Sequence, residues 1–114
     1  MRMMVKIHIP TQDGSDAIQH GSMERLISES LAAMNPECAY FYLEDGLRTM
    51  LAVFDMQSAS DMVPLFEPAM MELNAEVQLL PVMTLEDLKI GFNKLDARST
   101  DAQTSSETGA YTSG

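Results

Sequence analysis

The sequence has almost no cysteine and no tryptophan. Cys38 is the single cysteine among the 114 residues, so the chain cannot form an internal disulfide, which is typical of proteins in the reducing cytoplasm. No apolar run approaches the ~20 residues that a membrane-spanning helix needs. Lys6 and His8 interrupt the N-terminal segment, so we expect no signal peptide there. These absences predict a cytoplasmic protein without a membrane-spanning segment.

Basic residues are scarce as well. The chain has seven lysines and arginines against seventeen aspartates and glutamates, which gives a formal net charge of −10. Binding to nucleic acid requires a basic stripe that neutralises phosphates, and the sequence contains no such stripe. The acidic residues are spread along the chain, so we interpret them as a solvated surface and not as a docking face for a basic partner. We therefore expect no nucleic-acid partner.

Sequence motifs for binding metals and phosphates are also absent. His8, His20 and Cys38 are scattered, and neither H-x-x-x-H nor C-x-x-C occurs. Gly14 and Gly21 fit neither the G-x-G-x-x-G pattern nor the Walker pattern of phosphate-binding loops. The sequence therefore predicts no metal site and no cofactor.

The strongest local signal that is present is an Asp-Gly pair between two strand-like runs. Residues 39–44 and 47–54 are rich in aromatic and large apolar side chains, and Asp45-Gly46 separates them. This pair is typical of a two-residue β-hairpin turn, because its positions require a positive φ that glycine adopts freely and aspartate tolerates. The sequence therefore predicts an antiparallel hairpin at the middle of a small sheet.

Periodicity along the rest of the chain predicts two more strands and three helices. Apolar residues alternate in residues 3–10 and 76–83, which indicates strands. The predicted helices are a striped segment from Ser22 to Met34, a second segment from Ser58 to Leu73, and a third that starts at the capping-box-like Thr84-Leu85-Glu86-Asp87 and reaches Leu95.

Other segments predict departures from this regular pattern. Residues 11–15 have the composition of a turn, and residues 14–21 are the best candidate for a mobile lid. Pro68 removes a helical hydrogen bond, so we expect it to kink or split the second predicted helix. Residues 97–114 are rich in Ser, Thr and Gly and lack apolar periodicity, which predicts a disordered tail after a folded domain of residues 1–96.

The predicted order of elements is βαββαβ followed by a helix. This order is typical of the ferredoxin-like α+β fold, in which a four-stranded antiparallel sheet carries both main helices on one face. The right-handed crossover rule then places the strands at residues 3–10 and 47–55 in the centre of the sheet. We therefore expect a ferredoxin-like domain with an additional C-terminal helix.

The two faces of this sheet are predicted from the alternation of side chains. The side chains expected to face the helices are Val5, Ile7, Ile9, Phe41, Leu43, Leu51, Val53, Val77 and Leu79. Those expected on the open face are Met4, Lys6, His8, Tyr40, Tyr42, Arg48, Met50, Phe54, Leu80 and Val82. The open face is too apolar to be left to water, and a second copy of the chain is its simplest cover. The sequence therefore predicts a homodimer through the open sheet face.

This chain resembles the dimeric α+β-barrel superfamily in three features. They are the order of elements, the half-polar sheet face and the ending Pro81-Val82-Met83-Thr84-Leu85-Glu86-Asp87-Leu88. That superfamily includes antibiotic-biosynthesis-type monooxygenases, muconolactone isomerases and small uncharacterised bacterial members, which this chain resembles most. The resemblance covers residues 1 to about 95. It implies two sheets packed face to face, a pocket between sheet and helices in each subunit and, for an enzyme, cofactor-independent oxygenation or isomerisation.

Candidate site residues follow from the predicted open face. His8 is the candidate catalytic residue, since a histidine held by a tyrosine or a carboxylate can act as a general acid or base. The candidate ligand-binding residues are Lys6, Tyr40, Tyr42, Arg48 and Met50. In the alternative interpretation, His8 and Lys6 are hydrogen-bonded across a dimer interface, and the two tyrosines only pack across strands. The predicted function is binding of a small organic molecule, with a non-catalytic dimerisation or ligand-sensing module as the alternative.

Overall fold

Four antiparallel strands form the sheet of the computed structural model, which describes residues 1–104. The strands are β1 (Arg2–Ile9), β2 (Cys38–Glu44), β3 (Leu47–Asp55) and β4 (Glu76–Pro81). Their order in the sheet is β2-β3-β1-β4, so β1 and β3 are central, as the sequence predicted. The chain divides after Val82 into two units, and each unit is described by itself.

The predicted hairpin is confirmed, but it does not lie wholly at the middle of the sheet, because β2 is an edge strand. Glu44 pairs with Leu47, so Asp45 and Gly46 alone form the turn between β2 and β3. Both have a positive φ, 53° for Asp45 and 79° for Gly46, which is the backbone conformation of a primed two-residue turn. Asp45 and Gly46 therefore adopt the turn conformation that the sequence predicted for this pair.

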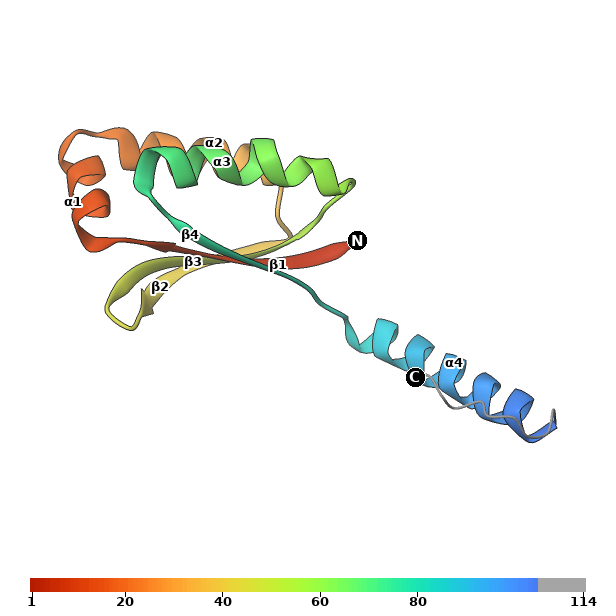
Figure 1. Ribbon diagram of the computed structural model, residues 1–114. Helices are drawn as coiled ribbons and strands as arrows, with labels where there is room; N and C mark the ends of the chain where they lie inside the picture. The colour runs from red at the N-terminus through yellow and green to blue at the C-terminus, as the bar shows by residue number, and fades with distance from the viewer. Residues whose placement is uncertain (105–114) are drawn as a thin grey trace. The chain divides into compact units, whose positions relative to one another are not determined.

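Within residues 1–82, three α-helices lie on one face of the sheet, as Figure 1 shows. They are α1 (Thr11–Gln19), α2 (Ser22–Met34) and α3 (Met62–Leu73), and a single 3-10 turn, η1 (Ala59–Asp61), precedes α3. The prediction of a turn at residues 11–15 was wrong, because α1 spans them. Gly14 is buried inside this helix against Ile9 and Arg48, so its lack of a side chain serves close packing here.

Pro68 was predicted to kink or split α3, and the split does not occur. α3 runs from Met62 to Leu73 with Pro68 inside it. The buried side chains of Phe66, Ala69 and Leu73 hold this helix against the sheet on both sides of the proline. Tertiary packing therefore outweighs the lost backbone hydrogen bond.

The predicted orientation of β3 was wrong as well. In a two-residue hairpin with Glu44 opposite Leu47, odd-numbered residues of β2 pair with even-numbered residues of β3, so Phe41 lies opposite Met50. Paired residues share a face, and Met50, Ala52 and Phe54 therefore lie under the helices. Leu51 and Val53 face the opposite side of the sheet.

The core lies between the three helices and the sheet. Val5 and Ala52 pair directly and are fully buried, and Phe54 meets Phe66 of α3 edge to face with ring centroids 6.1 Å apart. Fifteen buried apolar residues form this cluster: Met3, Val5, Ile7, Ile9, Ala17, Met23, Leu26, Met34, Met50, Ala52, Phe54, Phe66, Ala69, Leu73 and Ala75. The opposite face of the sheet carries no helix from residues 1–82 (Figure 1).

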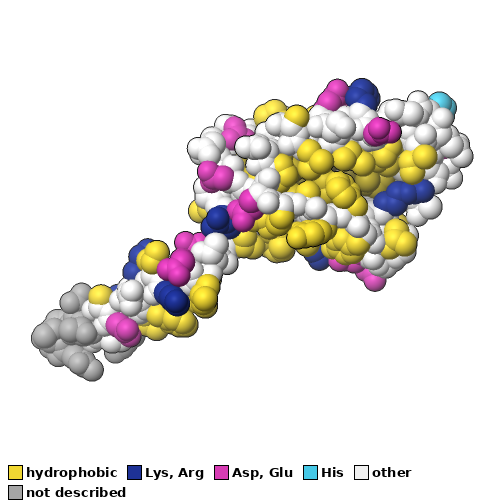
Figure 2. Space-filling model, turned by 180° about the vertical axis from the view of Figure 1, so that it is seen from behind, with side chains coloured by type: hydrophobic (Ala, Val, Ile, Leu, Met, Phe, Trp, Pro, Cys, Tyr) yellow, Lys and Arg dark blue, Asp and Glu magenta, His cyan; other side chains and the backbone are white. Residues whose placement is uncertain are grey.

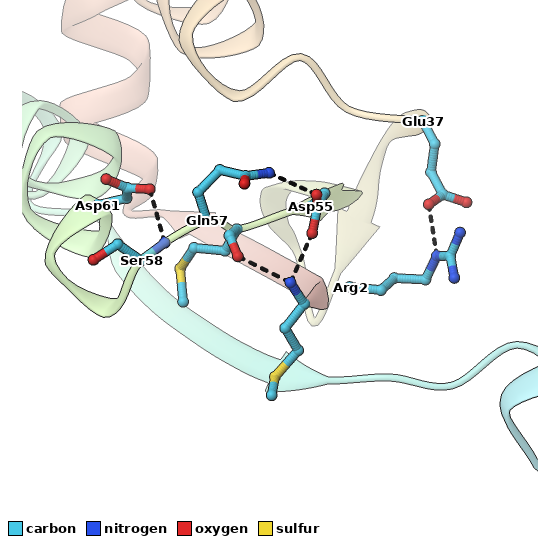
Figure 3. A network of polar contacts seen from close by, with 8 residues as sticks. Arg2, Glu37, Asp55, Gln57, Ser58 and Asp61 are labelled. Carbon is cyan, nitrogen blue, oxygen red and sulfur yellow. Dashed lines mark hydrogen bonds and ion pairs between the residues drawn. The ribbon is translucent and has the colours of Figure 1, made fainter. Parts of the chain in front are cut away.

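Polar contacts connect the start of β1 to the segments around it (Figure 3). Arg2 Nε donates to Glu37 Oε1 at 2.7 Å, and Gln57 Nε2 donates to Asp55 Oδ2 at 2.6 Å. The backbone N–H of Ser58 donates to Asp61 Oδ2 at 3.2 Å at the start of η1. These groups are exposed to solvent, so each contact positions the chain and contributes little to its stability.

The second unit begins at Met83 and contains α4 (Leu85–Thr104). Its predicted capping box is confirmed, since Thr84 N donates to Asp87 Oδ2 at 3.0 Å and Asp87 N donates to Thr84 Oγ1 at 3.1 Å. The prediction of a disordered tail was wrong for residues 97–104, which belong to this helix, and residues 105–114 of the predicted tail lie outside the described residues. Within residues 1–104, no helix combines the length and hydrophobicity that crossing a membrane requires.

Candidate functional site

The predicted site residues lie on two opposite faces of the sheet. The even-numbered residues of β1 and β2, including Lys6, His8, Tyr40 and Tyr42, occupy the face without helices. Arg48 and Met50 lie on the helix-covered face, which corrects the prediction that they share the open face. The cause is the orientation of β3 that the two-residue turn imposes.

On the open face, three of the predicted residues surround a carboxylate that the prediction did not include, Glu44 at the end of β2. Lys6 Nζ donates to Glu44 Oε1 at 3.1 Å, and Tyr42 Oη donates to the same oxygen at 3.0 Å. His8 Nε2 lies 2.8 Å from Glu44 Oε2. We call Lys6, His8, Tyr42 and Glu44 the Glu44 cluster. Tyr40 is not part of it and is 63% exposed.

A buried threonine explains how side chains from non-adjacent strands meet. β3 separates β1 from β2, and Thr49 of β3 pairs with His8 on one side and with Tyr42 on the other. Thr49 is only 3% exposed, and its hydroxyl donates to the carbonyl of Leu47 at 3.0 Å. Thr49 lies between His8 and Tyr42 in the sheet. Because its side chain is small, the longer side chains of the cluster can meet above β3.

The cluster shifts the pKa values of its members. Hydrogen bonds from His8, then Lys6 and Tyr42, lower the pKa of Glu44 from 4.5 to about 2. The pKa of Lys6 is raised, mainly by its hydrogen bond to Glu44. The pKa of Tyr42 is raised as well, first by desolvation of its hydroxyl and second by its hydrogen bond to Glu44. Glu44 is therefore ionised at neutral pH and only accepts, so His8 Nε2 must carry a proton. In a neutral His8 ring, Nδ1 is then a basic nitrogen that can accept a proton from another molecule.

Replacing Glu44 with glutamine is expected to lower stability at neutral pH and to remove part of its dependence on pH. The lowered pKa means that ionised Glu44 stabilises the fold fully above about pH 4.5, and that this contribution is lost as the pH falls toward about 2. The midpoints of urea unfolding of wild type and Glu44→Gln should therefore differ most near neutral pH and converge in acid. Glu24→Gln, which removes an exposed carboxylate from α2, is the control. A gap that persists unchanged at about pH 2 would contradict the charged role of Glu44.

On the helix-covered face, a cavity of about 450 Å³ lies between the sheet and the three helices. Figure 2 shows the side of the molecule on which hydrophobic side chains gather around a hollow. The cavity is lined by Ile7, Ile9, Ile18, Met23, Leu26, Ile27, Ser30, Phe41, Leu43, Arg48, Met50, Ala69 and Leu73, and also by Tyr42 and Thr49, which the alternation of the strands places on the open face. None of these residues is acidic, and Arg48 is the single Lys or Arg among them.

Arg48 supplies the charge in this mainly apolar lining. Its Nη1 donates to the carbonyl oxygen of Thr11 at 3.2 Å, and its Nη2 donates to Ser15 Oγ at 3.4 Å. Both partners are uncharged and belong to α1. The guanidinium therefore connects the hairpin to α1 without meeting a carboxylate there. Met50, 6% exposed, contributes apolar surface close to it.

Several residues of both sites were not predicted from the sequence. Glu44 was not among the predicted site residues, although its place on the same face as Tyr42 was available from the alternation. Ile18 and Ser30 line the cavity from α1 and α2, and their part in it depends on how the helices sit over the sheet. Among the side chains of residues 1–99, which the structure describes, no three His, Cys, Asp or Glu are grouped so that they could hold a metal ion.

Comparison of the chain with models of known protein families, with curated proteins and with solved structures finds no match. The interpretation of both sites therefore depends on their geometry and chemistry.

Proposed function

We propose that this chain binds a small, mainly apolar organic molecule in the cavity between its sheet and its helices. The observation that supports the proposal is the cavity itself. Its volume of about 450 Å³ is in the range of small-molecule sites, and its lining combines many apolar side chains with a few polar ones, which is the usual composition of such sites.

The edge of the sheet gives a physical reason for a ligand to bind. Phe41 and Leu43 of β2 lie on the helix-facing side of the sheet, yet they are 54% and 71% exposed. Both line the cavity. An apolar ligand would remove their side chains from water, and the free energy of that transfer is roughly proportional to the apolar area covered.

We further propose that the fold is ferredoxin-like and that two copies pair through the open sheet faces, as the resemblance to dimeric α+β barrels implies. The corrected open face supports this pairing, because Met4, Leu51, Val53, Tyr40 and Leu80 place apolar surface around the Glu44 cluster. In the alternative function, a non-catalytic dimerisation or ligand-sensing module, the Glu44 cluster would only set the register of the two sheets. The cavity favours ligand binding over a module whose only role is dimerisation.

A catalytic role for His8 is a separate question from binding in the cavity. His8 lies on the open face, whereas the cavity lies on the helix-covered face. Oxygenation or isomerisation with His8 as the base would need a substrate that reaches the Glu44 cluster. The proposed function is therefore binding, and we assign His8 no part in the cavity.

Native mass spectrometry tests the binding and the pairing together. Wild-type protein incubated with a panel of small apolar metabolites is expected to give the mass of a dimer and to retain at least one compound. Ser30→Trp, which fills the cavity from α2, should lose this retention while remaining folded. The control is Ser28→Trp, which puts the same side chain on the exposed side of α2. Retention by Ser30→Trp equal to that of Ser28→Trp would place the ligand elsewhere, and a monomeric mass would refute the pairing.

A further inference from the structure

Arg48 differs from the other basic residues of the first unit in having no acidic partner. Residues 1–82 contain four lysines and arginines, and three of them contact carboxylates: Arg2 with Glu37, Lys6 with Glu44, and Arg25 with Glu29 and Glu72. Among the described residues, Arg48 has only the neutral partners Thr11 and Ser15. These two hydrogen bonds use part of the five N–H donors of a guanidinium. Within the part of the chain that the structure describes, the cation at the apolar cavity therefore forms no ion pair with a carboxylate.

The position of the guanidinium is built into α1. A Cβ atom at Gly14 would lie 2.7 Å from Arg48 Nη1 and 3.1 Å from Ile9 Cγ2. Alanine favours a helix more than glycine does, but alanine at this position would collide with the guanidinium. Glycine in the interior of α1 therefore leaves the space that Arg48 occupies next to the cavity.

We propose that the ligand of the cavity carries one oxyanion, such as a carboxylate, on an apolar body, and that Arg48 binds this oxyanion. The inference rests on the proposed function, because it names the class of molecule that the same cavity takes. Burial of an apolar body in the lining would bring the anionic group beside a guanidinium whose fork matches a carboxylate. Hydrogen bonds between a guanidinium and a carboxylate are charge-assisted and are therefore stronger than hydrogen bonds between neutral groups. A cationic ligand would meet no acidic group in the lining, and a doubly anionic ligand would find no second Lys or Arg there.

Two probes of the same shape test the charge. Naphthalene-2-carboxylate has the proposed oxyanion, and naphthalene-2-carboxamide has the same ring system without the charge. Isothermal titration of wild-type protein is expected to show binding of the carboxylate about tenfold tighter than binding of the amide. Increasing salt should reduce this preference and leave the amide nearly unaffected.

Variants locate the preference at Arg48. Arg48→Met keeps the apolar stem and removes the charge, so the ratio of the two affinities should fall to near one. Arg48→Lys should restore part of the preference, since a lysine keeps the charge and lacks the planar fork. Gly14→Ala should also lower the ratio, because its Cβ displaces the guanidinium while the Arg48 residue itself is retained.

The outcomes separate the two proposals. Equal binding of both probes by wild type, blocked by Ser30→Trp, would overturn the oxyanion inference and leave binding in the cavity standing. If Ser30→Trp leaves the binding of the probes intact, the probes bind outside the cavity, and the oxyanion inference is overturned. If wild type binds neither probe, the inference is overturned as well, and these probes then provide no support for ligand binding in the cavity. A preference for the carboxylate that survives Arg48→Met would place the oxyanion at another cation and refute the role of Arg48. The wild-type ratio decides the charge even if an Arg48 variant does not fold.

Discussion

Replacing Phe54 with alanine is expected to destabilise the first unit by about 3–5 kcal/mol, the usual range for a buried phenylalanine. Phe54 is 1% exposed and lies on the central strand β3. Its ring meets Phe66 of α3 at 6.1 Å between centroids and 73° between planes, an arrangement that favours aromatic pairs. Truncation removes both the buried area and this contact, and the neighbouring helix and strands can close the resulting space only in part.

The matched control is Val53→Ala at the preceding position. Val53 is half-buried on the opposite face of the same strand, so its truncation should cost clearly less than that of Phe54. Urea unfolding of both variants, followed by circular dichroism at a fixed temperature, measures the two differences. A larger loss for Val53→Ala than for Phe54→Ala would mean that β3 presents Val53 to the helices, the orientation that the sequence pattern alone had suggested.

Replacing Pro68 with alanine is expected to stabilise the chain, by about 1–3 kcal/mol. Proline in the interior of a helix is about 3 kcal/mol less favourable than alanine, because it lacks the N–H of the helical hydrogen bond and its ring crowds the carbonyl one turn earlier. α3 continues through Pro68, so alanine can form the missing bond to the carbonyl of Pro64 without a change of fold. Pro68 is half-buried, and the loss of its ring contacts offsets part of the gain.

Pro64→Ala provides the control for this prediction. Pro64 stands in the first turn of α3, where a backbone N–H has little use within the helix, so alanine there should change stability by only a few tenths of a kcal/mol. Thermal unfolding of the two variants and of wild type compares them directly. A Pro68→Ala protein that melts below wild type would show that the contacts of the proline ring outweigh the restored hydrogen bond.

The hairpin and the capping box show which parts of this fold can be predicted from neighbouring residues. Asp45-Gly46 favours a two-residue turn through its backbone preferences, and Thr84 and Asp87 stabilise a helix start through bonds between groups three residues apart. The order of strands follows from handedness rules that depend only on the sequence of elements. These features were therefore available without coordinates.

The orientation of β3 was also available, although the apolar pattern obscured it. Both faces of this strand are apolar: Met50 and Phe54 on one, Leu51 and Val53 on the other. Hydrophobic alternation cannot choose between two such faces, but the length of the turn can, because it fixes which residues pair. Pro68 and Gly14 are different cases, since α3 and α1 are helical there through contacts with distant parts of the chain.

Local sequence preferences are thus sufficient for the hairpin turn and for the capping box that begins α4, because these depend on backbone conformations of a few adjacent residues. Only the folded chain brings Glu44 to Lys6 and His8 across a third strand, and only the folded chain sets Arg48 beside an apolar cavity under α1. Both sites join residues more than thirty positions apart in the sequence. Their geometry follows from strand register and helix packing, which no short stretch of sequence encodes.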